Sequence, residues 1–255
     1  MIPVAPDTTV RVANSERAAL KLDVDASADG ATITPRFGEP STVAVVGNEL
    51  PMPLLESPNI ARIDWTVGGV KAFATYAEVV SRHYFKLDDL RAYGDGQDDF
   101  ADLPEAALFR ARQAATEVFE QNARRSFVHR VGRTKDYGRG TLVNLDHCDV
   151  RELLTDGYRL VSDSQVVVDG PTLDPFPVFV EYEYGADDLP AQVSRAVLEL
   201  AAYMLRPSNR PVGATGESSD AGYIHFTTAG RDGATDIPEV NAAIQQFGRE
   251  AQCVW

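Results

Sequence analysis

The densest group of reactive side chains in the sequence is Asp146-His147-Cys148-Asp149. Imidazole, thiol and carboxylate groups can bind a metal ion, and a Cys beside a His can act as a nucleophile with its base. Adjacent residues on a strand point to opposite faces, however, so these four consecutive side chains would not converge. A free Cys is usually a small apolar core residue. The sequence therefore favours a turn with a buried Cys148.

Two loops could be mistaken for ligand-binding loops. Asp95 to Asp99 is acidic but lacks the alternating acidic positions, central Gly and terminal Glu of a calcium loop. Gly213 to Ser218 has glycines but no Lys-Ser/Thr pair to reach a phosphate, so we expect a flexible loop. The motifs HExxH, CxxC, GxSxG, GxGxxG and the Walker loop do not occur. We therefore expect no enzyme activity, catalytic residue, cofactor or metal. The alternative hypothesis is a metal-dependent hydrolase that uses the acidic loop and His147.

The overall charge excludes one class of partner. The 255 residues include 38 acidic and 24 basic ones, for a formal net charge of −14, which argues against a surface that wraps nucleic acid. The first residues lack a basic and apolar leader, and no stretch approaches the ~18 apolar residues of a membrane span, so we expect an unexported protein without membrane contact. Two cysteines are too few for a disulfide framework.

One segment reverses this charge locally. It contains six basic residues and only one acid, Asp136; the basic residues are Arg124, Arg125, Arg130, Arg133, Lys135 and Arg139. The segment is either a solvated face whose first arginines suit a helix C-terminus, or a basic patch that meets an acidic patch on a neighbouring copy. Residues 88 to 105 supply such an acidic patch, including Asp98 and Asp99. The predicted subunit interface therefore comprises Arg124, Arg125, Arg130, Arg133, Asp98 and Asp99.

Three helices are expected to position these segments. Each begins at an Asp that can cap free backbone N–H groups, followed by a Pro in the first turn: Asp102-Leu103-Pro104, Asp188-Leu189-Pro190 and Asp236-Ile237-Pro238. Each opens an apolar stripe with helical spacing. The stripes are Leu108, Ala111, Ala115, Val118, Phe119 and Asn122; Val193, Ala196, Val197, Leu200, Ala201 and Met204; and Ile237, Val240, Ile244 and Phe247.

The rest of the chain is rich in short strands. Residues 8 to 80 alternate apolar and polar positions between Gly, Pro and Asp turns, which predicts a small β-sandwich with Trp65 in its core. A second strand-rich patch spans residues 141 to 184. A polar loop is expected from Arg206 to Gly233, around a candidate strand at Tyr223-Ile224-His225-Phe226. The predicted fold class is α+β, with a β domain at 1–80 and a mainly helical domain with a short β-rich insertion at 81–255.

The order of several segments resembles that of head-to-tail adaptor, or head completion, proteins of long-tailed bacteriophages. These segments are His83 to Ala92, the helix Ala107 to Glu120 leading into Arg125-Ser126-Phe127-Val128-His129-Arg130, Val180 to Gly185, the helix from Pro190, Phe226 to Gly233, and Ile237 to Asn241. The resemblance covers residues 81 to 249. The run from Ile63 to Val80 is similar to the immunoglobulin-like extension that some adaptors carry.

The resemblance implies a structural virion protein. It implies a twelve-membered ring of copies in the neck, between the portal and a stopper or tail-terminator component, through which double-stranded DNA passes, and assembly in the host cytoplasm. We expect portal or partner docking through Ile237, Val240, Ile244, Phe247 and Trp255, because this helix of about three turns is too short to be stable alone and a terminal Trp is a common interface anchor. A tail or neck protein with an immunoglobulin-like module is a further alternative.

Overall fold

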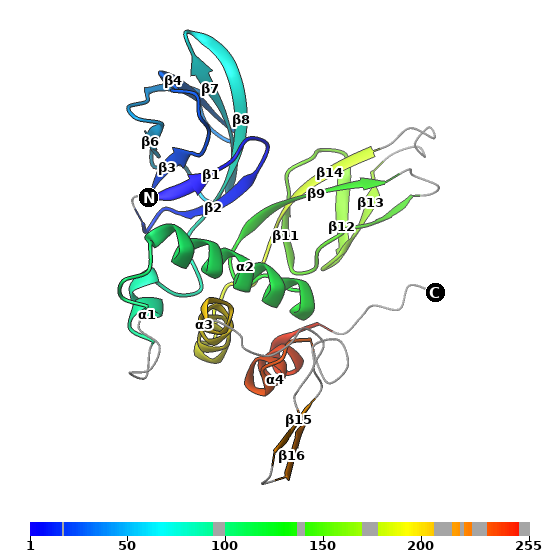
Figure 1. Ribbon diagram of the computed structural model, residues 1–255. Helices are drawn as coiled ribbons and strands as arrows, with labels where there is room; N and C mark the ends of the chain where they lie inside the picture. Colours follow the sequence, from blue (N-terminus) through cyan, green and yellow to red (C-terminus); the bar gives the residue numbers. More distant parts are fainter. Residues whose placement is uncertain are drawn as a thin grey trace. The chain divides into compact units, whose positions relative to one another are not determined.

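The computed structural model divides into two compact units (Figure 1). It describes residues 1–16, 18–93, 100–136, 141–169, 178–206, 216–219, 222–225 and 234–249. The β unit comprises Met1–His83 and Arg125–Asp188, and the helical unit comprises Tyr84–Arg124 and Leu189–Trp255. The chain therefore passes between the units three times.

The first part of the β unit contains two sheets. A five-stranded sheet has the order β2-β8-β7-β4-β5, with β2 Thr9–Ala13, β4 Gly30–Pro35, β5 Ser41–Ala44, β7 Asn59–Val67 and β8 Val70–Val80. A three-stranded sheet has the order β1-β3-β6, with β1 Ile2–Val4, β3 Ala19–Leu22 and β6 Glu49–Pro51. Trp65 is fully buried, as expected, and its Nε1 donates to Thr75 Oγ1 at 2.9 Å. The first 80 residues are thus β-rich around a core that holds this Trp.

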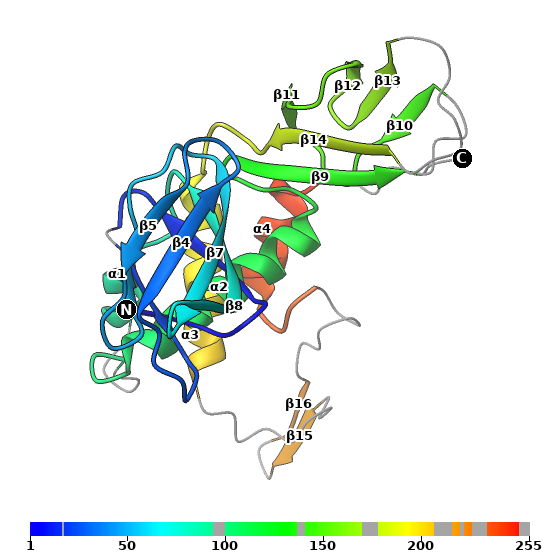
Figure 2. The same cartoon turned by 90° about the horizontal axis from the view of Figure 1, so that it is seen from above.

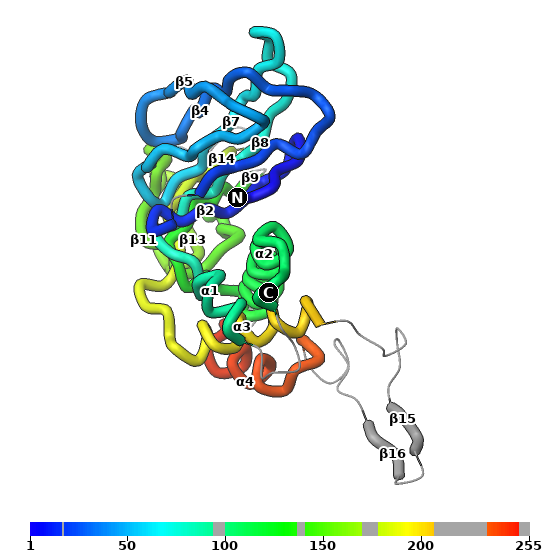
Figure 3. Tube along the Cα trace, turned by 60° about the vertical axis from the view of Figure 1, so that its left-hand side comes forward, coloured from blue at the N-terminus to red at the C-terminus, as the bar shows by residue number. Residues whose placement is uncertain are grey.

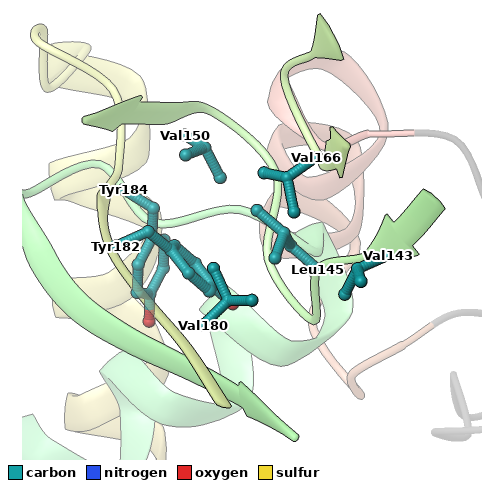
Figure 4. Close-up of a cluster of buried hydrophobic side chains, with 7 residues drawn as sticks. All are labelled: Val143, Leu145, Val150, Val166, Val180, Tyr182 and Tyr184. Atoms are coloured by element: carbon teal, nitrogen blue, oxygen red, sulfur yellow. The ribbon is translucent and has the colours of Figure 1, made fainter. Parts of the chain in front are cut away.

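The second part of the β unit contains strands in the range predicted from 141 to 184 and one further strand, β9, that precedes this range (Figure 2). One sheet has the order β11-β14-β9, with β9 Arg130–Asp136, β11 Val150–Leu153 and β14 Val178–Tyr184. The other has the order β10-β13-β12, with β10 Leu142–Asn144, β12 Tyr158–Ser162 and β13 Gln165–Val168. Their apolar faces meet in one cluster: Val143, Leu145, Val150, Val166, Val180, Tyr182 and Tyr184 (Figure 4).

The helical unit contains the three expected helices and a short one (Figure 3). The helices are α1 Leu87–Arg91, α2 Glu105–Ala123, α3 Ala191–Leu205 and α4 Pro238–Phe247. Their stripes are mostly buried, although Val118 is half-buried and Asn122 and Met204 are exposed. The loop expected from Arg206 to Gly233 includes a hairpin of β15 Gly216–Ser219 with β16 Gly222–His225. β16 confirms the candidate strand from Tyr223 to His225, and Phe226 lies outside the described residues. The expectation of a loop over 213–218 is wrong for its last three residues, which belong to β15.

The three aspartates do not cap their helices, which corrects the sequence prediction. Pro104 and Pro190 are themselves the N-cap residues, in extended backbone, and so each Asp lies two positions further from the first turn. At α4 the N-cap is Ile237 and the entry is fixed by another pair. Asn241 Oδ1 accepts from the backbone N–H of Thr235 at 2.8 Å, while its Nδ2 donates to the Thr235 carbonyl at 2.9 Å.

Gly185 is required where the chain leaves β14. Its φ is +120°, and a Cβ at this position would collide with the Val128 carbonyl oxygen. Gly185→Ala is therefore expected to destabilise the β unit by about 1–3 kcal/mol or more, measured by urea unfolding. The matched control is Gly157→Ala, where φ is +84° but a Cβ would meet nothing within 4 Å. Equal losses in both variants would show that the close approach to Val128 has no energetic weight.

Candidate assembly surfaces

The predicted basic patch begins at the end of α2. Arg124 is the C-cap residue of this helix, with φ 53° in the left-handed region, and its side chain is exposed. A cation at this end of a helix interacts favourably with the helix dipole. Arg139 lies outside the described residues, as do Asp98 and Asp99 of the acidic partner segment. The remaining basic residues belong to the β unit.

Two arginines of the predicted interface form ion pairs inside the β unit. Arg125 Nε lies 2.6 Å from Asp149 Oδ2, and Arg125 Cζ lies 5.4 Å from the centre of the Phe127 ring. Arg130 Nε lies 2.5 Å from Glu78 Oε1. Since both arginines already neutralise acids of their own unit, they add less positive charge to the surface than the sequence suggests.

Glu78 is the centre of an ionic triad in which Glu78 and Arg11 are buried and the Arg130 side chain is 23% exposed. Glu78 is only 7% exposed, and its second oxygen, Oε2, accepts from Arg11 Nε at 2.9 Å. Burial by itself raises the pKa of this carboxyl, but Arg11 and Arg130 outweigh it and the pKa lies below its usual value. The triad joins β2, β8 and β9, and thus connects the N-terminal sheet to the insertion.

The fourth arginine of the predicted interface, Arg133, lies at the surface. Its guanidinium lies over the exposed ring of Phe179, with Cζ 4.1 Å from the ring centre, and Lys135 Nζ lies 5.8 Å from that centre. Arg133 also lies near Glu181, with Nε 3.8 Å from Oε1, although Glu181 forms a closer ion pair with Arg36. This end of the β9–β14 sheet therefore exposes two cations around an aromatic ring.

A further charged cluster lies in the β unit. It includes residues that are close in sequence to the three points where the chain passes from one unit to the other. His129 Nδ1 lies 3.2 Å from Glu183 Oε1, and His129 Nε2 lies 3.2 Å from Asp187 Oδ1. Arg151 forms an ion pair with Asp187, and Arg82 Nη2 donates to the Asp187 carbonyl at 3.2 Å. The partners lie too far apart in the sequence for any local spacing to reveal them.

His147, from the predicted reactive group, packs against two residues of the core of the insertion. His147 Nδ1 lies 2.8 Å from the Tyr182 hydroxyl, and its ring stacks on Tyr184 with centres 4.0 Å apart. Burial raises the pKa of the Tyr182 hydroxyl. Residues 146–149 form a bend and not a strand, as expected, but Cys148 is half-buried and thus less buried than predicted. Among the described residues no three His, Cys, Asp or Glu side chains are placed to hold a metal ion.

The predicted docking helix is largely covered by its own unit. Ile237, Val240 and Ile244 are each less than 10% exposed, and Phe247 is half-buried. Beyond the helix the Arg249 N–H donates to the Ala123 carbonyl at 2.8 Å, which holds the chain against the end of α2. Trp255 lies outside the described residues. Within the described part of the chain, none of the helices is long and apolar enough to cross a membrane.

Comparison with known proteins gives weak structural similarities. No family model and no curated protein matches the chain. A chain from the neck of an empty gene transfer agent particle, computed with C6 symmetry, is 21% identical with a TM-score of 0.39, over 51% of this chain and 83% of that one. A chain from the virion of the native gene transfer agent particle is 22% identical with a TM-score of 0.39, over 51% of this chain and 82% of that one. TM-scores at this level do not establish a shared fold.

Proposed function

We propose that this chain is a structural protein of a phage-like virion neck. In this proposal it is a head-to-tail adaptor whose copies form a twelve-membered ring between the portal and a stopper or tail-terminator component. The ring leaves a channel for double-stranded DNA, and the protein performs no catalysis. The β-rich first 80 residues are an immunoglobulin-like extension of the adaptor domain.

The observation that carries the proposal is how the resembling segments are used in the helical unit. Tyr84, from the first of these segments, donates its hydroxyl to Glu120 Oε1 on α2 at 2.7 Å. The Tyr84 carbonyl accepts from Ser194 Oγ on α3 at 2.6 Å. The next carbonyl, of Phe85, accepts from Arg112 Nη1 at 3.4 Å. Residues that carry the sequence resemblance thus form hydrogen bonds with both α2 and α3.

The burial of one side of α4 within its own unit leaves only part of the predicted docking residues accessible to a partner. Because Ile237, Val240 and Ile244 are buried in their own unit, contact with the portal would use the exposed side of α4, the half-buried Phe247 and the chain end that carries Trp255. The acidic overall charge suits a channel that does not hold the passing duplex. Salt-sensitive duplex binding by the isolated protein would contradict this part of the proposal.

The direct test is to locate the chain in particles. We expect gold-labelled antibody against an epitope-tagged copy to bind at the junction of head and tail in electron micrographs of intact particles. Labelling of the head surface or the distal tail, or no labelling of purified particles, would refute a neck location. Metal-dependent turnover of phosphoesters or peptides by the purified chain, lost on chelation, would favour the hydrolase alternative.

A further inference from the structure

The face of the β9–β14 pair that points away from the core of the insertion differs in exposure along its length. Residues on alternate positions share a face, and Thr134 and Val180 point into the core of the insertion. On the opposite face Glu181 is half-buried and forms an ion pair with Arg36. At the far end of the same face Phe179 is 41% exposed. This end of the face is therefore an exposed patch that includes an aromatic ring.

The exposed patch is cationic and aromatic. We define it as Arg133, Lys135 and Phe179, which are neighbours because Lys135 pairs with Phe179 and Arg133 with Glu181 in the strand register. The Arg133 side chain is 57% exposed although its guanidinium stacks on the Phe179 ring. A stacked guanidinium is held in one orientation and still presents N–H donors to a carboxylate. The patch thus suits an acidic protein surface that can also cover an aromatic ring.

The helical unit carries an acidic surface of this kind. Asp88 and Asp89 lie in the first turn of α1, Asp102 lies just before α2 and Glu105 is its first residue, and α1 packs against α2. All four acids are exposed, and the Asp88 side chain is 86% exposed. Asp88 forms an ion pair with Arg91 of the same helix, with Nη1 3.4 Å from Oδ1. In a chain with 14 excess negative charges, a surface patch of positive sign is most readily matched by another copy of the same chain.

We propose that the Arg133–Lys135–Phe179 patch of one copy docks on the acidic surface of Asp88, Asp89, Asp102 and Glu105 of a second copy. The inference rests on the proposed ring, for which it supplies the contact between neighbours. The two surfaces differ, so the contact is heterologous, and repeated head-to-tail contacts close into a ring if the rotation permits. Each exposed ion pair contributes little alone, so the contact depends on several pairs acting together with burial of the ring of Phe179.

The first test reverses the charge of the patch. The double variant Arg133→Glu/Lys135→Glu is expected to weaken self-association at least about tenfold, with the difference largest at low salt, where screening is least. The matched control, Lys21→Glu/Arg159→Glu, makes the same charge change on exposed β-unit side chains outside the patch and is expected to associate like the wild type. Sedimentation velocity over a concentration series measures association, and circular dichroism confirms folding of each variant.

The second test restores the complementarity. Asp88→Lys/Asp102→Lys alone is expected to associate as poorly as the patch variant, whereas a chain carrying all four changes is expected to recover. Wild-type-like association of Arg133→Glu/Lys135→Glu or of Asp88→Lys/Asp102→Lys would overturn the proposal. Failure of the four-change chain to recover association would also overturn it. A wild-type chain that stays monomeric at every concentration would also overturn it, while particle labelling decides the neck location separately. Duplex DNA that binds the wild type and not the patch variant would assign the patch to nucleic acid instead.

Discussion

Replacement of Glu78 by glutamine is expected to lower the free energy of unfolding of the β unit by about 3–5 kcal/mol. The neutral amide would leave Arg11 and Arg130 beside each other in a buried site without their shared anion. Removing one member of a buried ionic group is costly for this reason, even when the complete group adds little net stability. Urea unfolding followed by tryptophan fluorescence measures the loss, because Trp65 lies in the same sheet.

The control is Glu49→Gln, which removes an exposed pair with Lys21 whose Nζ lies 3.6 Å from Oε1. It is expected to cost much less, since exposed ion pairs are weak. A loss in Glu78→Gln no larger than in this control would show that the triad is not energetically important. The triple variant Arg11→Met/Glu78→Leu/Arg130→Met is expected to recover much of the stability, because it removes all the buried charges together.

The same triad predicts an acid-dependent term in stability. The pKa of Glu78 is lowered from its usual 4.5 in the folded protein, so the unfolded chain binds this proton more readily. The stabilisation is therefore fully present above the unfolded-state pKa and is lost as the pH falls through the folded-state pKa. The stability difference between wild type and Glu78→Gln should shrink below about pH 4.5. A difference that is constant from neutral to acidic pH would contradict this assignment.

The helices and strands were predictable because their signals are local. The stripes of α2 and α3 repeat at helical spacing, and the alternation along β14 predicts its two faces. The helix starts were predicted at nearly the right residues but for a partly wrong reason, because Pro104 and Pro190 stand at the N-cap themselves. The Thr235–Asn241 pair at α4 spans six residues, whereas the partners in an N-cap or a capping box lie two or three residues apart.

The predicted basic patch shows where sequence reasoning fails. Six bases in a short segment indicate a positive surface only if their counter-ions lie elsewhere. Arg125 and Arg130 instead pair with Asp149 and Glu78, which are 24 and 52 residues away. The chain topology brings these partners together, and no spacing in the sequence encodes them. Arg133 and Lys135 are more exposed than Arg125 and Arg130, and only the strand register shows that they share the face of β9 opposite to the core of the insertion.

Phe119→Ala is expected to destabilise the helical unit by about 3–5 kcal/mol. Phe119 is fully buried on α2, and its truncation removes apolar contacts and leaves a cavity between packed helices. Val118→Ala on the same helix is the matched control and is expected to cost far less, because Val118 is only half-buried. Thermal unfolding followed at 222 nm compares the two variants. Similar losses would mean that the buried ring of Phe119 contributes no more to the core than the half-buried Val118 of the same stripe.

Hydrogen exchange in the same variant tests which segments unfold together. If the compact units unfold separately, Phe119→Ala should increase exchange in α2, α3 and α4 while β9 and β14 stay as protected as β7 and β8. If the domain boundary predicted near residue 80 governs cooperativity instead, β9 and β14 should lose protection together with the helices. Glu78→Gln should give the opposite pattern in the first case, because its triad ties β9 to β2 and β8 within one unit. Loss of protection throughout the chain in both variants would show that the two units unfold as a single cooperative body.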